Sequence, residues 1–290
     1  MLLIEIFFLR GILATMTIDL HMHSTASDGA MSPRELVDFV HASGVSVMAL
    51  TDHDTVHGVK AAQERANELG LRLITGVEIT ALWSDMDVHI VGLGVDIENA
   101  DFLAFLAGQG ERRDRRAKTM GERLQALGCE NAYEKAYALA GTAFISRSHF
   151  ATVLLDEGLV ESRNQAFKKY LGNQGPAYVK ADWPSLKMTV DWIHRAGGVA
   201  IIAHPGRYNY TSEAHKEALV SEFKALGGDG IEVTSGSQSP NHTEYYRSRA
   251  LAYDLYASTG SDFHRLEGMR PTPGAQEPLP LGLKSILEIL

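Results

Sequence analysis

Short apolar runs recur along the chain, and most of them are separated by stretches with helical periodicity. The runs at 45–50, 71–77 and 199–203 are apolar on both faces, which is typical of buried parallel strands. With four further runs they predict strands at 17–23, 45–51, 71–80, 87–95, 199–203, 230–234 and 255–260. Strands that alternate with helices indicate an α/β architecture, closed or nearly closed into a barrel.

Capping residues mark where helices begin and end. The sequence SPRE at 32–35 predicts a helix start, with Ser32 as N-cap and Glu35 at the third helical position. Gly44 is expected to end that helix. A second helix is predicted at 184–195.

The alternation breaks in the middle of the chain. Between 99 and 181 there is no convincing strand, but helical runs occur at 100–127, 132–140, 148–157 and 162–171. An all-helical insertion between the fourth and fifth strands explains this better than a long loop. We therefore expect a barrel domain built from 17–98 and 182–290, with a helical insertion domain at 99–181.

Residues 1–16 are apolar but are interrupted by Glu5 and Arg10. The segment is too short to span a bilayer, and it lacks the basic start and cleavage site of a signal peptide. Because Met16 directly precedes the first predicted strand, we interpret Met16 as the natural start and the rest of this segment as an upstream extension. A peripheral anchor is the alternative, and no other contact with a membrane is expected.

Composition and charge narrow the class of protein. The 290 residues are 45% hydrophobic, as in ordinary globular proteins, and the net charge is −9. This charge argues against broad nonspecific binding to nucleic acid but not against a phosphorylated substrate, since bound cations reverse the local field. Cys129 is the single cysteine, which excludes an internal disulfide and favours a reducing cytoplasm.

Nine histidine and carboxylate side chains lie at or near the ends of the predicted strands. Side chains two apart in an extended chain point to the same face, so each of the pairs His21/His23 and Asp262/His264 can offer two ligands to one ion. Imidazole and carboxylate suit manganese, zinc or iron, and several such ligands together indicate a multinuclear hydrolytic site. The nine candidate metal ligands are His21, His23, Asp28, His53, Glu78, His89, His204, Asp262 and His264.

Each candidate also has an ordinary interpretation. A histidine inside an apolar strand, such as His89, is more often a satisfied core residue. Glu78 alone would be a solvated charge at a strand end, and Asp28 alone a turn residue. All nine fall at the same predicted end of the barrel, which is where α/β barrels carry their chemistry. The ordinary interpretation would have to be true of all nine residues at once, which favours a shared site.

Six short motifs resemble those of the PHP (polymerase and histidinol phosphatase) family: DLHMHSTASDG, ALTDHD, GVE, VHIVGLG, IAHPG and GSDFH. The resemblance extends from 17 to about 266. It implies a distorted (β/α)7 barrel with three divalent ions at the carboxyl ends of the strands. By motif, the implied ligand sets are His21, His23, Glu78 and Asp262; Glu78, His89 and His204; and Asp28, His53 and His264. Because no thiolate is present, manganese is preferred, with zinc or iron as alternatives.

The helical insertion and the segment ISRSH at 145–149 are similar to one branch of that family, which acts on 3′,5′-nucleoside bisphosphates and on the 5′ ends of short RNA. The similarity implies that Arg147 and His149 contact substrate phosphate. Ser148 stands where the usual pattern has proline. Without the similarity, Arg147 could also be a surface arginine at a helix start, although guanidinium matches phosphate well.

Two further groups have open interpretations. Arg112, Arg115 and Arg116 share a face of a predicted helix, which is by default a solvated face and otherwise a phosphate clamp. One of the aromatic residues near the predicted mouth could stack on a nucleobase; these are Trp83, Trp183 and Tyr208.

Asp52 or Asp54 is expected to orient His53.

These expectations predict a metal-dependent phosphoesterase in which Glu78, Asp262 and His264 are catalytic. It would convert a nucleoside 3′,5′-bisphosphate such as pAp to AMP and phosphate, and would trim short 5′-phosphorylated RNA from the 5′ end. No obligate protein partner is expected. The alternatives are a phosphatase of histidinol phosphate or another small phosphomonoester, and a non-catalytic PHP interaction module. The chain lacks the HExxH motif of metallopeptidases.

Overall fold

The computed structural model describes residues 16–236, 238–266 and 271–290. The predicted extension, apart from Met16, lies outside the described residues. Seven strands form one sheet in chain order: β1 (Ile18–Asp19), β2 (Val47–Leu50), β3 (Arg72–Trp83), β4 (Met86–Leu93), β5 (Val199–Ile202), β6 (Gly230–Ser235) and β7 (Tyr256–Gly260). The predicted strands are all present, with β1 much shorter than expected.

The two edges of the sheet meet, so the sheet nearly closes into a barrel. The Leu20 amide donates to the Thr259 carbonyl at 3.0 Å, and the His23 amide donates to the Phe263 carbonyl at 2.9 Å. The α/β barrel prediction is confirmed.

One strand runs against the others. β3 pairs with β2 in parallel, but β4 is antiparallel to both β3 and β5. Ser84 and Asp85, both with positive φ, form the tight turn between β3 and β4, which leaves no room for a helix there. In this hairpin His89 pairs with Thr80, two residues beyond Glu78. The reversal explains why His89 can reach the site from within a strand.

Five helices pack around the barrel: α2 (Pro33–Ala42), α3 (Val59–Leu69), α8 (Leu186–Arg195), α9 (Glu213–Ala225) and α10 (Pro240–Ala252). The capping box of Ser32 and Glu35 is present at the start of α2. The helix predicted at 184–195 begins at Leu186, because Ser185 caps it. Short 3-10 helices occur at η2 (Pro205–Arg207) and η3 (Ile286–Glu288).

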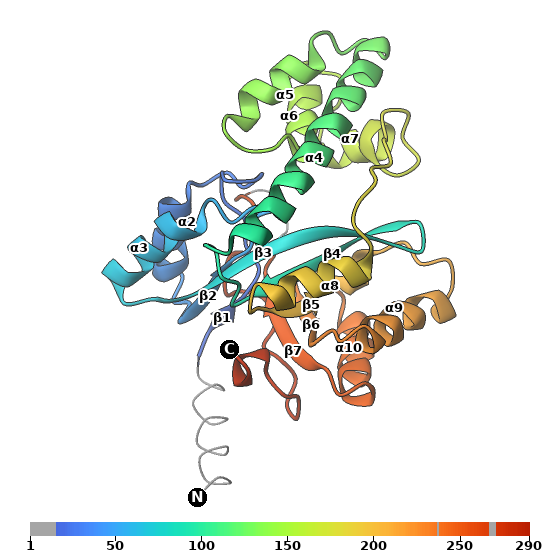
Figure 1. The fold of residues 1–290 in the computed structure, drawn as a ribbon. Helices are drawn as coiled ribbons and strands as arrows, with labels where there is room; N and C mark the ends of the chain where they lie inside the picture. The colour runs from blue at the N-terminus through green and yellow to red at the C-terminus, as the bar shows by residue number, and fades with distance from the viewer. Residues whose placement is uncertain (1–15, 237, 267–270) are drawn as a thin grey trace, which may run out of the picture.

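Between β4 and β5 the chain forms helices only: α4 (Ala100–Ala126), α5 (Ala132–Ala140), α6 (Arg147–Asp156), α7 (Arg163–Ala166) and the π-helix η1 (Phe167–Leu171). Figure 1 shows α4 rising from the barrel into this group, which stands above the strands and is called the cap here. The cap has a hydrophobic cluster of its own, with Leu124, Phe150 and Leu154 fully buried. The division of the chain into two domains stays a prediction that this separate core supports.

Side chains of the strands alternate between two apolar layers. In β2, Met48 and Leu50 belong to the cluster beneath the surrounding helices, whereas Val47 and Ala49 belong to the cluster inside the barrel. The inner cluster also holds Leu20, Ile74, Val91, Ile201 and Ala203. Because apolar side chains fill the inside of the barrel, its polar side chains gather at the end beneath the cap. No helix in the described part of the chain is long and apolar enough to cross a membrane.

Candidate metal centre

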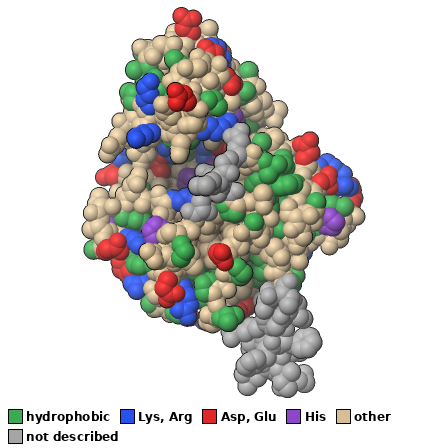
Figure 2. Space-filling model, turned by 180° about the vertical axis from the view of Figure 1, so that it is seen from behind, with side chains coloured by type: hydrophobic (Ala, Val, Ile, Leu, Met, Phe, Trp, Pro, Cys, Tyr) green, Lys and Arg blue, Asp and Glu red, His purple; other side chains and the backbone are tan. Residues whose placement is uncertain are grey.

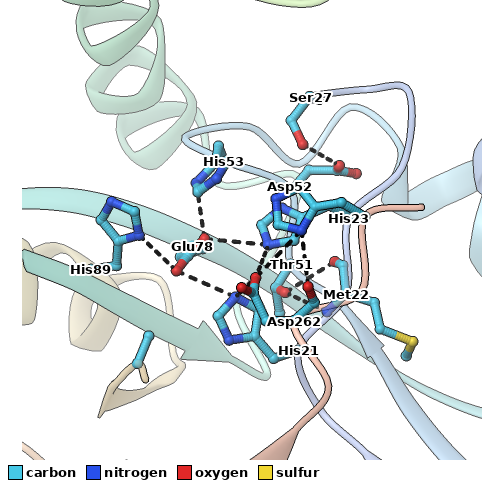
Figure 3. A network of polar contacts seen from close by, with 12 residues as sticks. His21, Met22, His23, Ser27, Thr51, Asp52, His53, Glu78, His89 and Asp262 are labelled. Carbon is cyan, nitrogen blue, oxygen red and sulfur yellow. Dashed lines mark hydrogen bonds and ion pairs between the residues drawn. The ribbon is translucent and has the colours of Figure 1, made fainter. Parts of the chain in front are cut away.

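Glu78 lies at the centre of the predicted ligands, and both of its carboxylate oxygens face histidines (Figure 3). Its Oε1 lies 2.9 Å from His89 Nδ1, 2.9 Å from His204 Nε2 and 3.3 Å from His21 Nε2. Its Oε2 lies 2.9 Å from His53 Nδ1 and 3.3 Å from His23 Nε2. Glu78 is fully buried, and its carboxylate contacts five histidines from four segments of the chain.

Asp262 and Asp28 lie on two sides of this group. Asp262 Oδ1 is 3.1 Å from His23 Nε2 and 3.4 Å from His21 Nε2. Asp28 Oδ1 is 3.3 Å from His264 Nε2 and 3.8 Å from His53 Nε2. All nine residues predicted from the sequence therefore come together at one end of the barrel.

Ligand atoms of these residues form three compact groups among the described residues: His21, His23, Glu78 and Asp262; His53, Glu78 and His89; and His23, Asp28, His53 and His264. The first group equals one set implied by the resemblance. The other two differ from the implied sets: the middle group holds His53 in place of His204, and the outer group holds His23 in addition.

The hydrogen bonding of the site fits metal ions. Buried polar atoms are normally satisfied, yet several candidate ligand atoms have no hydrogen-bond partner among the described residues. These are His21 Nε2, His23 Nδ1, Asp28 Oδ1, His53 Nδ1, Glu78 Oε2 and His204 Nδ1. Nitrogen and oxygen atoms without donors or acceptors, so close to one another, are the environment that a divalent ion would satisfy.

Charge at the site follows from its packing. Burial would raise the pKa of Glu78, but the facing His21, His89 and His53 hold the pKa well below its usual range. Burial, with the nearby His264 and His53, lowers the pKa of His23 to about 3. An ionised carboxylate and a neutral imidazole are the forms that bind metal.

Backbone strain marks two of the ligands. His204 and Asp262 have positive φ values of 29° and 52°, which non-glycine residues rarely adopt. Each lies two residues after the end of a strand, where the chain turns into the site. Gly260 precedes Asp262, and a Cβ atom there would lie 2.3 Å from His21 Cβ, so only glycine allows β1 and β7 to approach this closely.

A cavity of about 680 Å³ lies between the ligands and the cap. Figure 2 shows this side of the molecule, with Lys and Arg side chains on the cap beside the hollow. The ligands on its wall include His53, His89 and His264, and cap residues on the opposite wall include Arg147 and Phe167. The site is thus open to a ligand that spans from the barrel to the cap.

The PHP domain family model matches residues 19–179. The chain belongs to the PHP domain family. It is 45% identical to a 5′-3′ exoribonuclease of Haemophilus influenzae over 86% of this chain and 90% of that protein. It is 43% identical to a 3′,5′-nucleoside bisphosphate phosphatase of Chromobacterium violaceum over 85% of this chain and 87% of that one.

The fold of this PHP chain has a close parallel among solved structures. The structure of an amidohydrolase from Chromobacterium violaceum, with bound sulfate and no metal, aligns with a TM-score of 0.89 at 40% identity. The match covers 94% of this chain and 95% of that one. The resemblance inferred from the motifs is confirmed.

Glu232 is a site residue of this PHP domain that the sequence interpretation missed. Its Oε1 is 2.7 Å from His21 Nδ1, and its Oε2 accepts a 2.5 Å hydrogen bond from the His204 amide. A carboxylate that bonds the far nitrogen of a histidine fixes its ring and tautomer. The available signal was a glutamate within the apolar strand GIEVTS, where a charge needs a buried partner.

Arg207 was missed as well. It pairs with Asp262 Oδ2 and also donates to the Gly236 carbonyl. Burial opposes the effect, but Arg207 is the main charge that holds the pKa of Asp262 well below its usual range. Its signal was its position just after the motif IAHPG.

The expectation for Asp52 and Asp54 is wrong in its detail. Asp52 accepts hydrogen bonds from the Ser24 amide and hydroxyl, at 2.8 and 2.7 Å, and from the Ser27 hydroxyl at 2.6 Å. It therefore fixes the loop that leads to Asp28 rather than the His53 ring. Burial raises the pKa of Asp52 to about 6, despite these hydrogen bonds.

Asp54 connects the barrel to the cap instead. Arg113 Nε donates to Asp54 Oδ2 at 2.6 Å, and Gln109 Nε2 donates to Asp54 Oδ1 at 2.9 Å. Arg113 Nη2 also donates to the Thr80 hydroxyl at 2.9 Å. Two side chains of α4 thus hold the residue next to His53 and the strand that carries Glu78.

The arginine face predicted on α4 divides into two. Arg115 is exposed, and Arg112 donates to the Asp182 carbonyl at 2.8 Å. Arg116 is only 9% exposed, so the default interpretation as a solvated face is wrong for it. Arg116 and the unanticipated Arg113 line the cavity.

The three aromatic residues suggested for base stacking are engaged elsewhere. Trp83 Nε1 donates to Glu222 at 2.7 Å, and the Tyr208 hydroxyl accepts from the His89 amide at 2.7 Å. The Trp183 ring faces the Arg113 guanidinium at 5.5 Å. None of the three lines the cavity, whereas Phe167 does.

Arg147 and His149 lie where the cap approaches the ligands. Arg147 lines the cavity, with its guanidinium 5.9 Å from the Phe167 ring. His149 Nδ1 accepts a 2.9 Å hydrogen bond from the Ser146 amide and completes a capping box at the start of α6. The Ser146 hydroxyl donates to Asp28 Oδ2 at 3.0 Å, so this segment contacts the metal centre directly. Contact of Arg147 and His149 with phosphate stays a prediction.

Proposed function

We propose that this protein is a metal-dependent phosphoesterase that removes the 3′-phosphate of nucleoside 3′,5′-bisphosphates and trims 5′-phosphorylated RNA from its 5′ end. The observation that carries the proposal is the ligand cluster centred on Glu78, which opens into a cavity with arginines on its far wall. The activities named for relatives of 45% and 43% identity support both substrates. The lone buried Cys129 supports a reducing cytoplasm as its location.

Three divalent ions are proposed for the site, with the ligand sets implied by the motifs. A donor set of nitrogen and oxygen without thiolate favours manganese, with zinc or iron as alternatives. Bound ions would supply an activated water at neutral pH and polarise the phosphoryl oxygens.

The protein's own groups position this chemistry. Glu78 presents one oxygen to His89 and His204 and the other to His53 and His23, so it is proposed as the bridging carboxylate. Asp262 and His264 are proposed to complete the centre from the segment after β7. All three would hold ions whose positive charge attracts the phosphoryl oxygens of the substrate.

The cap is proposed to bind the second phosphate. Burial, together with the charge of the nearby Arg147, lowers the pKa of Arg116 to about 10. Burial also lowers the pKa of Arg147, with Arg113 contributing. Arg116 Nη2 is buried and has no hydrogen-bond partner in the described part of the chain. A phosphate between these guanidinium groups would offset their repulsion and satisfy that donor. His149 is proposed to assist from the start of α6.

The test compares pAp, histidinol phosphate and a short 5′-phosphorylated RNA as substrates, with added manganese. We expect turnover of pAp and RNA, and little of histidinol phosphate, which lacks a second phosphate. Arg147→Lys should raise KM for pAp at least tenfold, since lysine keeps the charge but not the two-pronged geometry. The exposed Lys187→Gln is the control.

Equal preference for histidinol phosphate would contradict the substrate assignment. Glu78→Gln should remove turnover while circular dichroism shows a folded chain. Full activity of that variant would contradict the proposed metal centre.

A further inference from the structure

The outer side of the cap carries a second hollow that adjoins the cavity over the metal centre. This hollow, of about 660 Å³, is lined by Asn164, Gln165, Lys168 and Lys169. Asn164 also lines the first cavity, so the two spaces are neighbours at this side chain. A ligand longer than the first cavity would pass Asn164 to reach the second hollow.

The four side chains come from α7 and η1, and all of them line the same hollow. Both lysine side chains are exposed. Lys169 Nζ stands 5.0 Å from the Tyr170 ring, which holds the ammonium over an aromatic surface.

Charge along this segment is opposite to that of the whole chain. Residues 162–181 contain Arg163, Lys168, Lys169 and Lys180 and no Asp or Glu, although the chain has 36 acidic and 27 basic residues. Many exposed lysines elsewhere pair with a carboxylate, as Lys187 does with Asp191 and Lys118 with Asp114. Within the described residues, Lys168 and Lys169 have no such partner. Their positive charge is therefore uncompensated beside the cavity.

We propose that Asn164, Gln165, Lys168 and Lys169 bind the phosphodiester backbone of RNA, in the nucleotides that follow the one being released. This inference rests on the proposed function and names how a polymer is held in addition to a mononucleotide. Lysine offers a flexible point charge, which suits phosphates without reading sequence. Phe167, on the wall of the first cavity, offers a ring on which a base of the same strand can stack.

The experiment uses the double variant Lys168→Gln/Lys169→Gln in the full chain. With a short 5′-phosphorylated RNA, kcat/KM should fall roughly tenfold at moderate salt, since two phosphate contacts are lost. The slope of log kcat/KM against log salt should become shallower by about 1.4, from roughly 0.7 for each single-strand phosphate contact. Turnover of pAp should stay within about twofold, since one nucleotide does not need the second hollow.

Lys60→Gln/Lys187→Gln removes the same charge from exposed positions on α3 and α8 and should change neither substrate. If the two double variants give the same RNA kinetics and the same salt slope, the proposal is overturned. An equal fall for RNA and pAp would also overturn it, since the lysines would then act on the shared site.

Binding is measured separately from turnover, by fluorescence anisotropy of a 3′-labelled RNA in EDTA. Weaker binding by the Lys168/Lys169 variant alone supports the surface even if hydrolysis fails. A wild-type protein that turns over pAp but binds no RNA would overturn the inference while leaving the phosphatase proposal intact. A protein that turns over neither substrate would contradict the proposed function itself.

Discussion

At the scale of single residues, the site depends on buried carboxylates whose charge is stabilised by the histidines around them. Glu232 is 1% exposed and is held between His21 Nδ1 and the His204 amide. It faces the side of the His21 ring that is turned away from Glu78. Its role is therefore to position a ligand rather than to touch the reacting atoms.

Glu232→Gln should lower metal affinity by roughly 10- to 100-fold, because the amide no longer fixes the His21 ring as a charged acceptor does. Manganese titration, followed by calorimetry and by activity, measures the change. Saturating manganese should restore most of the activity. Glu217→Gln, on α9, changes the same type of residue among tyrosines and should leave the affinity unchanged. Equal affinities in the two variants would show that Glu232 does not position the ligand.

At the scale of elements, the long helix α4 joins the cap to the strands. Arg113 is 7% exposed and pairs with Asp54, which is fully buried. Asp54 also accepts a 2.9 Å hydrogen bond from the Thr80 amide on β3. This contact fixes the loop after β2 to the hairpin of β3 and β4, and so sets the position of His53 relative to Glu78.

Arg113→Met should destabilise the protein by about 3–5 kcal/mol, because it leaves the buried Asp54 carboxylate without the positive charge that pairs with it. Urea denaturation monitored by circular dichroism measures the loss. Arg115→Met, on the exposed side of the same helix, should change stability by no more than about 0.5 kcal/mol. Similar denaturation midpoints for both variants would contradict the structural role of the Arg113–Asp54 pair.

At the scale of the whole molecule, the barrel end gathers ligands from segments up to 243 positions apart in the sequence, as from His21 to His264. Such a site exists only in the folded chain, so ions that bind it favour folding. Several candidate ligand atoms are buried without a hydrogen-bond partner in the described part of the chain, which should make the protein less stable when no metal is bound.

Saturating manganese should therefore raise the melting temperature by several degrees, since each ion at a hundred times its Kd adds about 2.7 kcal/mol. Differential scanning calorimetry with manganese or with EDTA measures the shift. Glu78→Gln should lose most of it. A melting temperature that does not respond to manganese would contradict a metal centre in this protein.

The sequence alone determined the strands, the helical run between the fourth and fifth strands, and the nine side chains that gather at one end of the barrel. Apolar runs and helix caps are local features of the sequence. Histidines and carboxylates at the ends of buried strands stand out because polar side chains are uncommon there unless they have a function. The 3.6-residue periodicity also found α4 and its arginines, but it could not tell which of them faces the cavity.

Only the tertiary structure decided which residues support the ligands. Glu232, Arg207 and Arg113 reach the site from β6, η2 and α4, and their partners are distant in the sequence. The reversed direction of β4 likewise follows from a two-residue turn whose effect depends on how the strands pair. Local preferences fix the elements, whereas burial and charge pairing between distant segments are settled when the barrel closes beneath the cap.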